Sequence, residues 1–253
     1  MARPPLPLLA AVLGLGGLLL ADALRPGPDG RAPAAEPPGR RAAQPSASSG
    51  ARPDLAPPDV AVRRATRERI LTLGRATYLD SLLLISDSAI RRWGEGDEPI
   101  RYAFDPAHPE GWHPAYADEV REAVRRWVPG PRRVAEVTDT AEADVVVSWL
   151  PQFAFRRAGQ TDLYWDARGA IYRARVLLAL RSDQGLPLPR EARLAVAMHE
   201  VGHVLGLPHS ADSADVMYEA TRVDAPSARD RRTLRLLYDL PLGLVREPRP
   251  RGP

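Results

Sequence analysis

The chain has 253 residues, of which 44% are hydrophobic and 26% charged, so it can bury one moderate core or two small ones and is not a wholly disordered protein. Its 35 basic residues are all arginine, and 32 acidic residues reduce the net charge to +3, so despite a pI near 9.6 we do not expect nucleic-acid binding. Cysteine is absent, which excludes disulfides and thiolate metal sites, so histidine and carboxylate side chains must hold any metal.

The N-terminal segment has the pattern of an export signal. Arg3 precedes an apolar run over residues 8–20, and Ala21, Asp22 and Ala23 form the small-x-small pattern of a signal-peptidase site. A helix over this run spans about 20 Å, less than the roughly 30 Å of the hydrocarbon layer. We therefore expect residues 1–23 to be a cleaved signal peptide and the protein to be secreted or held in the cell envelope. Membrane contact is expected only if this segment stays uncleaved as an anchor.

Two segments separate the signal from the rest of the chain. Residues 24–58 are rich in Pro, Ala, Gly and Arg, with too few large apolar residues to offset the entropy of ordering, and we expect a disordered linker. Residues 59–94 contain apolar positions at helical spacing, with Gly74 as a break between two helices. The apolar positions are Leu79, Leu82, Leu83, Ile90 and Trp93. This segment is either a helical pro-segment or a fixed N-terminal extension of the next domain.

The pattern from residue 95 to 242 is mixed α/β, and we expect one domain there, followed by a tail over 243–253. Strands are predicted over 99–104, 132–138, 144–150 and 171–180, and helices over 116–128, 189–205 and 227–238. Gly159 to Trp165 is either an edge strand on which an extended peptide could pair or a plain hairpin arm.

Residues 199–209 contain three of the five histidines of the chain, in the pattern His-Glu-x-x-His-x-x-Gly-x-x-His. His199 and His203 are four residues apart on one helical face, so both rings can reach one zinc ion at about 2.0 to 2.1 Å. Gly206 can adopt the positive φ that ends a helix, and the chain then turns so that His209 becomes the third ligand. A fourth position stays open for water, as in catalytic zinc sites.

Glu200 is predicted to lie beside the metal, where it can act as a general base. Zinc would polarise the substrate carbonyl and acidify its bound water, whose proton Glu200 would accept and pass to the leaving amine. Three imidazoles and a free carboxylate favour zinc over iron or copper. An alternative from another class is a non-catalytic zinc-containing binding protein. The intact Glu200 counts against it, because a structural zinc needs no base.

The array over residues 199–209 resembles the zinc-binding signature of the metzincin metalloproteases and is most similar to the matrixin branch. The resemblance covers roughly residues 95–240. It implies an α/β fold with a twisted, mostly parallel sheet, an active-site helix and a C-terminal helix, and it implies a zinc endopeptidase that acts on peptide or protein substrates. The methionine turn of the family corresponds to Met217, which would form a hydrophobic floor beneath the zinc ligands.

The chain also departs from the matrixin pattern. Matrixins place a proline two residues after the turn methionine, where this chain has Glu219; Tyr218 and Glu219 are our candidates for the substrate pocket. Animal matrixins bind a structural zinc and calcium ions in the loops before the active-site helix. Residues 155–170 of this chain contain no histidine, and their carboxylates are Asp162 and Asp166, so a structural zinc is not expected and calcium is unsupported. The thiol-based latency of many matrixin zymogens is impossible without cysteine.

Some alternatives remain open. His108 and His113 lie in a proline-rich loop, which is either a second metal site or an ordinary surface loop. The substrate is either general protein or a restricted maturation or self-processing site. The sequence does not set the oligomeric state.

Overall fold

The computed structural model describes residues 59–84, 88–154 and 156–246. The predicted signal peptide over 1–23 and the predicted linker over 24–58 lie outside the described residues, as does most of the predicted C-terminal tail. Within the described ranges, no helix combines the length and the apolar character needed to cross a membrane.

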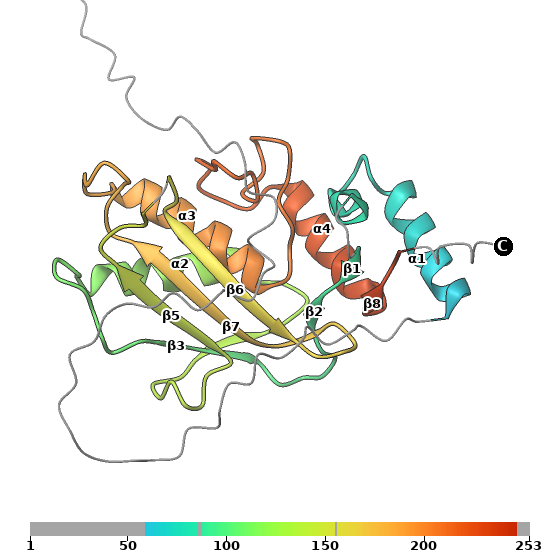
Figure 1. Cartoon of the computed structure of the whole chain (residues 1–253), viewed down its shortest axis with the longest axis horizontal. Helices are drawn as coiled ribbons and strands as arrows, with labels where there is room; N and C mark the ends of the chain where they lie inside the picture. The colour runs from blue at the N-terminus through green and yellow to red at the C-terminus, as the bar shows by residue number, and fades with distance from the viewer. Residues whose placement is uncertain (1–58, 85–87, 155, 247–253) are drawn as a thin grey trace, which may run out of the picture.

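A twisted, mostly parallel sheet forms the centre of the molecule (Figure 1). Its strands, in spatial order, are β2 (Arg92–Trp93), β7 (Ala170–Ala179), β5 (Val145–Leu150), β3 (Ile100–Phe104) and β4 (Val134–Glu136). These strands pair in parallel, whereas β6 (Gly159–Trp165) pairs antiparallel with β7. The register places Val147 beside Val176, and both side chains are buried in the core. This sheet confirms the predicted α/β fold class.

Helices α2 (Ala115–Trp127) and α3 (Arg190–Val204) pack against each other and against the sheet. The indole Nε1 of Trp127 donates to the Met198 carbonyl at 2.9 Å, which fixes α2 against the middle of α3. Because α3 is covered on several sides, every residue from Met198 to Val204 is buried. The two histidines on this helix therefore lie inside the protein and not on a solvated face.

The helices and strands predicted between residues 95 and 242 agree with the structure to within a few residues, but the helical prediction around Ile90 and Trp93 is wrong. These residues belong to two short strands, β1 (Ala89–Ile90) and β2. All residues from Ser88 to Trp93 are buried, so the spacing of the apolar ones carries no information about helical period. β1 pairs with β8 (Gly243–Leu244), which lies within the segment predicted as a tail.

The N-terminal segment forms helix α1 (Val60–Thr72) and a short 3-10 helix, η1 (Leu79–Leu83), on either side of the expected break at Gly74. Ile70 and Leu79 are fully buried in the same hydrophobic core as the sheet. α1 lies beside the C-terminal helix α4 (Ala228–Asp239), at the end of the molecule away from β3 and β5 (Figure 1).

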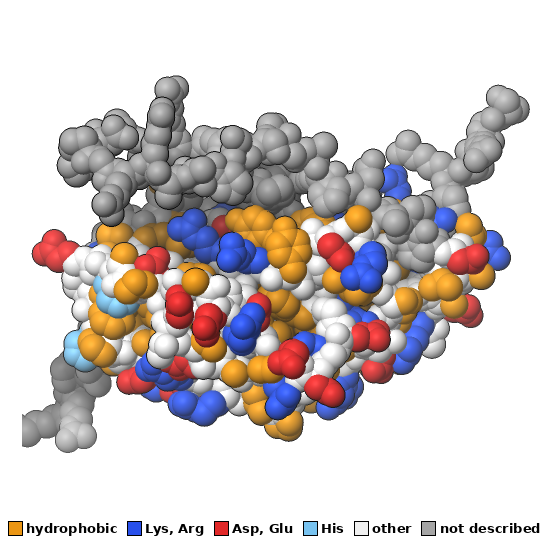
Figure 2. Space-filling model, turned by 90° about the horizontal axis from the view of Figure 1, so that it is seen from below, with side chains coloured by type: hydrophobic (Ala, Val, Ile, Leu, Met, Phe, Trp, Pro, Cys, Tyr) orange, Lys and Arg blue, Asp and Glu red, His pale blue; other side chains and the backbone are white. Residues whose placement is uncertain are grey.

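Charges of both signs are interspersed on the face shown in Figure 2, with hydrophobic side chains between them. Several arginines pair with carboxylates across elements. Arg101 contacts Asp144 at 3.1 Å, and Arg121 contacts Glu136 at 2.6 Å. Such pairing neutralises arginine charge locally, in keeping with the small net charge of the chain.

Candidate metal centre

Three histidines converge where α3 ends and the chain turns back. His199 and His203 stand one turn apart on α3, and the helix ends at Val204. Gly206 has φ +98°, and a Cβ there would lie 2.7 Å from the Arg91 carbonyl oxygen, so the turn needs both the positive φ and the missing side chain of glycine. The chain then brings His209 back to the two helical histidines.

The spacing of the three rings fits a metal ion. The Nε2 atom of His203 lies 3.1 Å from Nε2 of both His199 and His209, and the other two Nε2 atoms are 3.2 Å apart. Three nitrogens bound tetrahedrally to zinc at about 2.0 to 2.1 Å would be separated by about 3.3 Å. The triad is therefore positioned to bind zinc.

The Nδ1 atoms of His199 and His203 each contact a backbone carbonyl, and this contact turns Nε2 toward the cluster. Nδ1 of His199 lies 2.9 Å from the Val216 carbonyl oxygen, and Nδ1 of His203 lies 2.8 Å from that of Leu207. A carbonyl oxygen only accepts, so each Nδ1 carries the proton and each Nε2 presents a lone pair. Two lone pairs 3.1 Å apart repel each other, and a cation between them removes this cost. The donor arrangement thus matches a metal site better than a hydrogen-bonded histidine cluster.

Burial keeps these imidazoles neutral, as metal ligands must be. Desolvation lowers the pKa of His199 to about 4. The pKa of His209 is also lowered to about 4, by burial and then by the neighbouring His199. Burial and both neighbouring rings lower the pKa of His203 well below its ordinary value. At neutral pH no proton therefore competes with a metal for these nitrogens.

Glu200 is buried between α3 and strand β6. Thr161 Oγ1 donates to Glu200 Oε2 at 2.7 Å and lies 3.2 Å from the Glu200 carbonyl oxygen. A Cβ at Gly159 would lie 2.3 Å from Glu200 Oε1, so the carboxylate occupies space that this glycine leaves free. Burial raises the pKa of Glu200 to about 7, and the hydrogen bond from Thr161 opposes the shift. A carboxyl group with this pKa exchanges protons readily near neutral pH.

Gly159 and Thr161 have roles at this site that were not predicted from the sequence. Strand alternation could have placed both on the face of β6 that is turned toward α3, together with the buried Leu163. Nothing in the sequence indicated that this face meets Glu200, because the two segments are about forty residues apart.

Met217 forms a fully buried floor beneath the helix that carries the histidines. A Cβ at Gly202 would lie 2.2 Å from Met217 Sδ and 3.0 Å from the Trp127 ring, so Gly202 allows Met217 to approach α3. Gly202 was not predicted from the sequence, although a glycine inside a helix costs about 1 kcal/mol and so indicates a close approach.

Two buried carboxylates hold the turn around Met217. Asp215 accepts from the hydroxyls of Ser210 and Ser227, both at 2.6 Å. Asp230 accepts from the backbone N–H groups of Val216 and Ser227, both at 2.8 Å. Ser227 caps α4 and forms a capping box with Asp230. The same residues that start α4 therefore fix the backbone next to Met217.

The candidate pocket residues follow this turn. Tyr218 is half-buried, and its N–H donates to the Asp215 carbonyl at 3.2 Å; Glu219 is exposed. Their contribution to a substrate pocket stays a prediction.

The histidines of the proline-rich loop lie apart from this cluster. His108 stacks on Trp112, and His113 Nδ1 accepts from the Ala115 N–H at 3.2 Å. Within the described residues, the His199, His203 and His209 triad is the one group found with the geometry for a metal. The second metal site considered for this loop has no support.

Comparison with known families agrees with this geometry. The family model for matrixins matches residues 183–239, a segment that contains α3, the His209 turn, Met217 and α4. No curated protein matches the chain. The family match confirms the matrixin-like resemblance and indicates a zinc metallopeptidase, with a fold consistent with a metzincin-like catalytic domain.

Proposed function

We propose that this chain, with its matrixin-like segment, is an exported zinc endopeptidase that hydrolyses peptide bonds with Glu200 as general base. The observation that carries the proposal is the convergence of three Nε2 atoms within 3.1 to 3.2 Å, with a buried carboxylate at the adjacent position in α3. Export is supported by the signal-like pattern of residues 1–23.

Each residue of the site has its own role in the proposed reaction. His199, His203 and His209 would hold zinc, which when bound supplies Lewis acidity toward the substrate carbonyl and the attacking water. Glu200 accepts the proton of that water and returns it to the departing amine nitrogen. Thr161 holds the carboxylate through the hydrogen bond to Oε2, so that Oε1 remains directed toward Gly159 and available for the proton.

Strand β6 provides a surface for an extended peptide. In the described part of the chain its one strand partner is β7, which leaves its other edge free. Its residues Gly159 and Thr161 contact Glu200, so a peptide paired along this edge would pass beside the proposed base. This placement supports a substrate that is a protein or peptide in extended form.

The decisive experiment is Glu200→Gln. The amide keeps the shape of the side chain and the three histidines but cannot accept the proton. We expect zinc content and thermal unfolding close to wild type and a loss of turnover of about 10² to 10⁴. Zinc content is measured by metal analysis and turnover with a peptide library.

The matched control is Glu191→Gln, because Glu191 is exposed in the first turn of the same helix. It should retain wild-type turnover. Full activity in Glu200→Gln would contradict the assignment of the base. A zinc-loaded wild type that cleaves no peptide, with or without residues 24–58, would instead favour the non-catalytic binding protein.

A further inference from the structure

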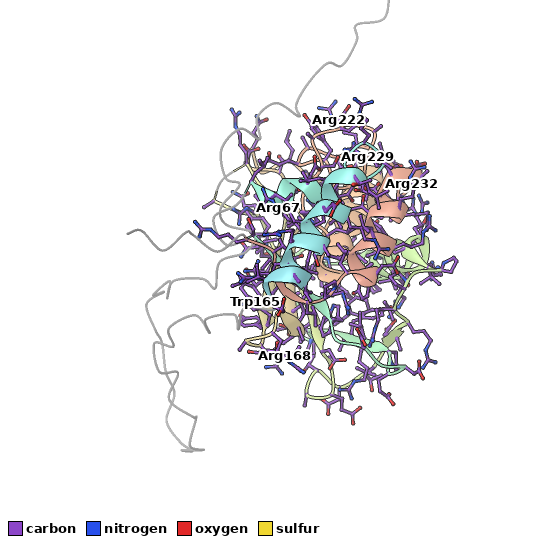
Figure 3. All side chains as sticks on the ribbon, turned by 90° about the vertical axis from the view of Figure 1, so that its right-hand side faces the viewer. Arg67, Trp165, Arg168, Arg222, Arg229 and Arg232 are labelled. Carbon is purple, nitrogen blue, oxygen red and sulfur yellow. The ribbon has the colours of Figure 1, made fainter. Side chains whose placement is uncertain are left out.

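The N-terminal segment, residues 60–83, is fixed to helix α4. Figures 1 and 3 both place α1 beside α4, and Figure 3 labels Arg229 on α4 and Arg67 on α1. The Arg229 guanidinium donates to the Thr77 carbonyl at 3.3 Å, and the Tyr78 N–H donates to Thr233 Oγ1 at 3.3 Å. These contacts lie on buried or half-buried groups, so this segment is part of the folded core.

A chain of hydrogen bonds leads from this segment to the metal centre. The Tyr78 hydroxyl donates to Asp230 Oδ1 at 2.8 Å, and the Val216 N–H donates to Asp230 Oδ2 at 2.8 Å. The Val216 carbonyl then lies 2.9 Å from His199 Nδ1. Tyr78 is 2% exposed and His199 7%, while Asp230 and Val216 are fully buried. Water therefore does not replace any of these partners easily.

Tyr78 completes the set of donors around Asp230. An ionised carboxylate only accepts, and Oδ2 already receives the N–H groups of Val216 and Ser227. Oδ1 receives the Tyr78 hydroxyl, so Tyr78 fixes the rotation of the carboxylate about its side chain. Burial and the Asp230 carboxylate raise the pKa of Tyr78 above its ordinary value, and the phenol stays a donor.

A second set of contacts links the N-terminal segment to the same turn. The Arg229 guanidinium, which contacts Thr77, also donates to Asp215 Oδ2 at 3.0 Å and lies 5.4 Å from the centre of the Tyr78 ring. Asp215 directly precedes Val216, so the hydrogen bonds through Tyr78 and those through Arg229 reach the same turn. The N-terminal segment thus holds the backbone that orients His199 from two sides.

We propose that Tyr78 is a positioning residue for the metal centre, acting through Asp230 and Val216 on His199, and that residues 60–83 are a permanent part of the catalytic domain and not a removable pro-segment. The inference rests on the proposed function, because it concerns the orientation of a zinc ligand. Removal of the segment would leave the buried Asp230 without its hydroxyl donor and would weaken the site, whereas removal of an inhibitory pro-segment would activate it.

The test compares Tyr78→Phe with Thr233→Val. Both variants remove one hydroxyl partner at the same buried interface, but only Tyr78 reaches Asp230. Zinc affinity of the full chain is measured by competition with a chromophoric chelator, and thermal unfolding is measured in parallel. We expect similar losses of Tm, with zinc Kd raised about 10-fold in Tyr78→Phe, the lower end of the loss typical of groups bonded directly to a metal ligand, and changed less than about threefold in Thr233→Val.

Equal zinc affinities in the two variants would overturn the positioning role while leaving the proposed function intact. A wild type that binds no zinc would overturn the proposed function and this inference together. The Co²⁺-substituted protein gives a second signature, because a reoriented His199 changes the visible spectrum. We expect that change in Tyr78→Phe and not in Thr233→Val.

A measurement on wild type covers the case in which Tyr78→Phe does not fold. Coupling between two sites is reciprocal, so zinc binding should strengthen the docking of residues 60–83. We expect hydrogen exchange of peptides that contain Tyr78 and Ser81 to slow on addition of zinc, together with peptides over residues 199–218. Slowing confined to residues 199–218 would overturn the inference.

Discussion

At the scale of single residues, small side chains decide how closely the functional groups of this protein approach one another. Gly159 leaves the space that the Glu200 carboxylate occupies, and Gly202 leaves the space for Met217. Thr161 supplies the hydrogen bond that holds Glu200 in place. None of these residues ligates a metal or carries a charge, yet each restricts a group that does.

The Gly159→Ala variant tests this restriction. Its Cβ would lie 2.3 Å from Glu200 Oε1, and the flexible carboxylate would rotate away while the strand and the zinc site stay intact. Because a displacement of about 1 Å can cost about 10²-fold in rate, we expect a loss of kcat of that order with unchanged zinc content. Peptide hydrolysis and metal analysis measure the two effects.

Gly94→Ala is the matched control, since a Cβ at Gly94 meets nothing within 4 Å. It should have wild-type kcat. Wild-type turnover in Gly159→Ala would show that the placement of Glu200 beside β6 is not required for catalysis.

At the scale of secondary-structure elements, two of the three candidate metal ligands lie on helix α3 and the third lies after the turn that follows this helix. The helical period alone places His199 beside His203. His209 reaches them because the chain leaves the helix at Val204 and turns at Gly206. The turn after Asp215 is in turn held by the capping residues of α4, so two helices and two turns form one rigid unit.

The Gly206→Ala variant should disturb this unit. Any residue with a Cβ atom has a strained backbone at φ +98°, and this Cβ would also lie 2.7 Å from the Arg91 carbonyl oxygen. We expect the zinc-loaded protein to lose about 1 to 3 kcal/mol of unfolding free energy, measured by urea denaturation.

Gly111→Ala separates the two causes. Gly111 has φ +82°, close to that of Gly206, but open space around its Cβ position, so it carries a similar conformational cost without the clash. The loss should be smaller than in Gly206→Ala. Equal losses would mean that contact with the Arg91 backbone contributes nothing.

At the scale of the whole molecule, the metal centre joins parts of the chain that are far apart in sequence. α3 packs against the sheet and against α2, and the turn before Met217 is tied to α4 and through it to the N-terminal segment. Three neutral imidazoles converge here, two of them buried with their Nε2 lone pairs toward the cluster, and this arrangement is costly without a cation. Zinc should therefore stabilise the entire fold and not only the site.

Removal of zinc by a chelator should lower Tm at pH 7 and make Tm depend on pH. The pKa values of His199 and His209 are about 4 in the folded chain, whereas an unfolded histidine titrates near 6.5. Below pH 6.5 the unfolded chain thus takes up protons that the folded chain does not, so the stability of the metal-free protein falls as pH falls from 6.5 toward 4.

Calorimetry of the chelated protein between pH 7 and 5 measures this effect. Glu200 opposes it in this range, because burial raises its pKa to about 7 and the folded chain takes up that proton first, but the three histidines outweigh this one carboxyl group. The zinc-loaded protein at saturating metal serves as the control and should have the higher Tm throughout. A Tm that is independent of pH in the chelated protein would contradict the burial of neutral histidines, and a Tm unaffected by chelation would contradict zinc as a stabilising ligand.

The sequence by itself determined those features that depend on neighbours along the chain. The four-residue spacing of His199 and His203, the glycine that ends the helix and the alternation of strands and helices after residue 95 are local patterns, and backbone geometry translates them directly into structure. The metal cluster and the α/β fold class were predictable for this reason.

Only the tertiary structure decided which distant segments meet. Ile90 and Trp93 keep a helical spacing but form strands, because their backbone partners are Gly243 and Ile171. The contact of Thr161 with Glu200 and the hydrogen bond of Tyr78 to Asp230 join residues 39 and 152 positions apart. No local period encodes such pairs, since they arise from how the sheet, α3 and α4 pack, and packing is a property of the folded chain as a whole.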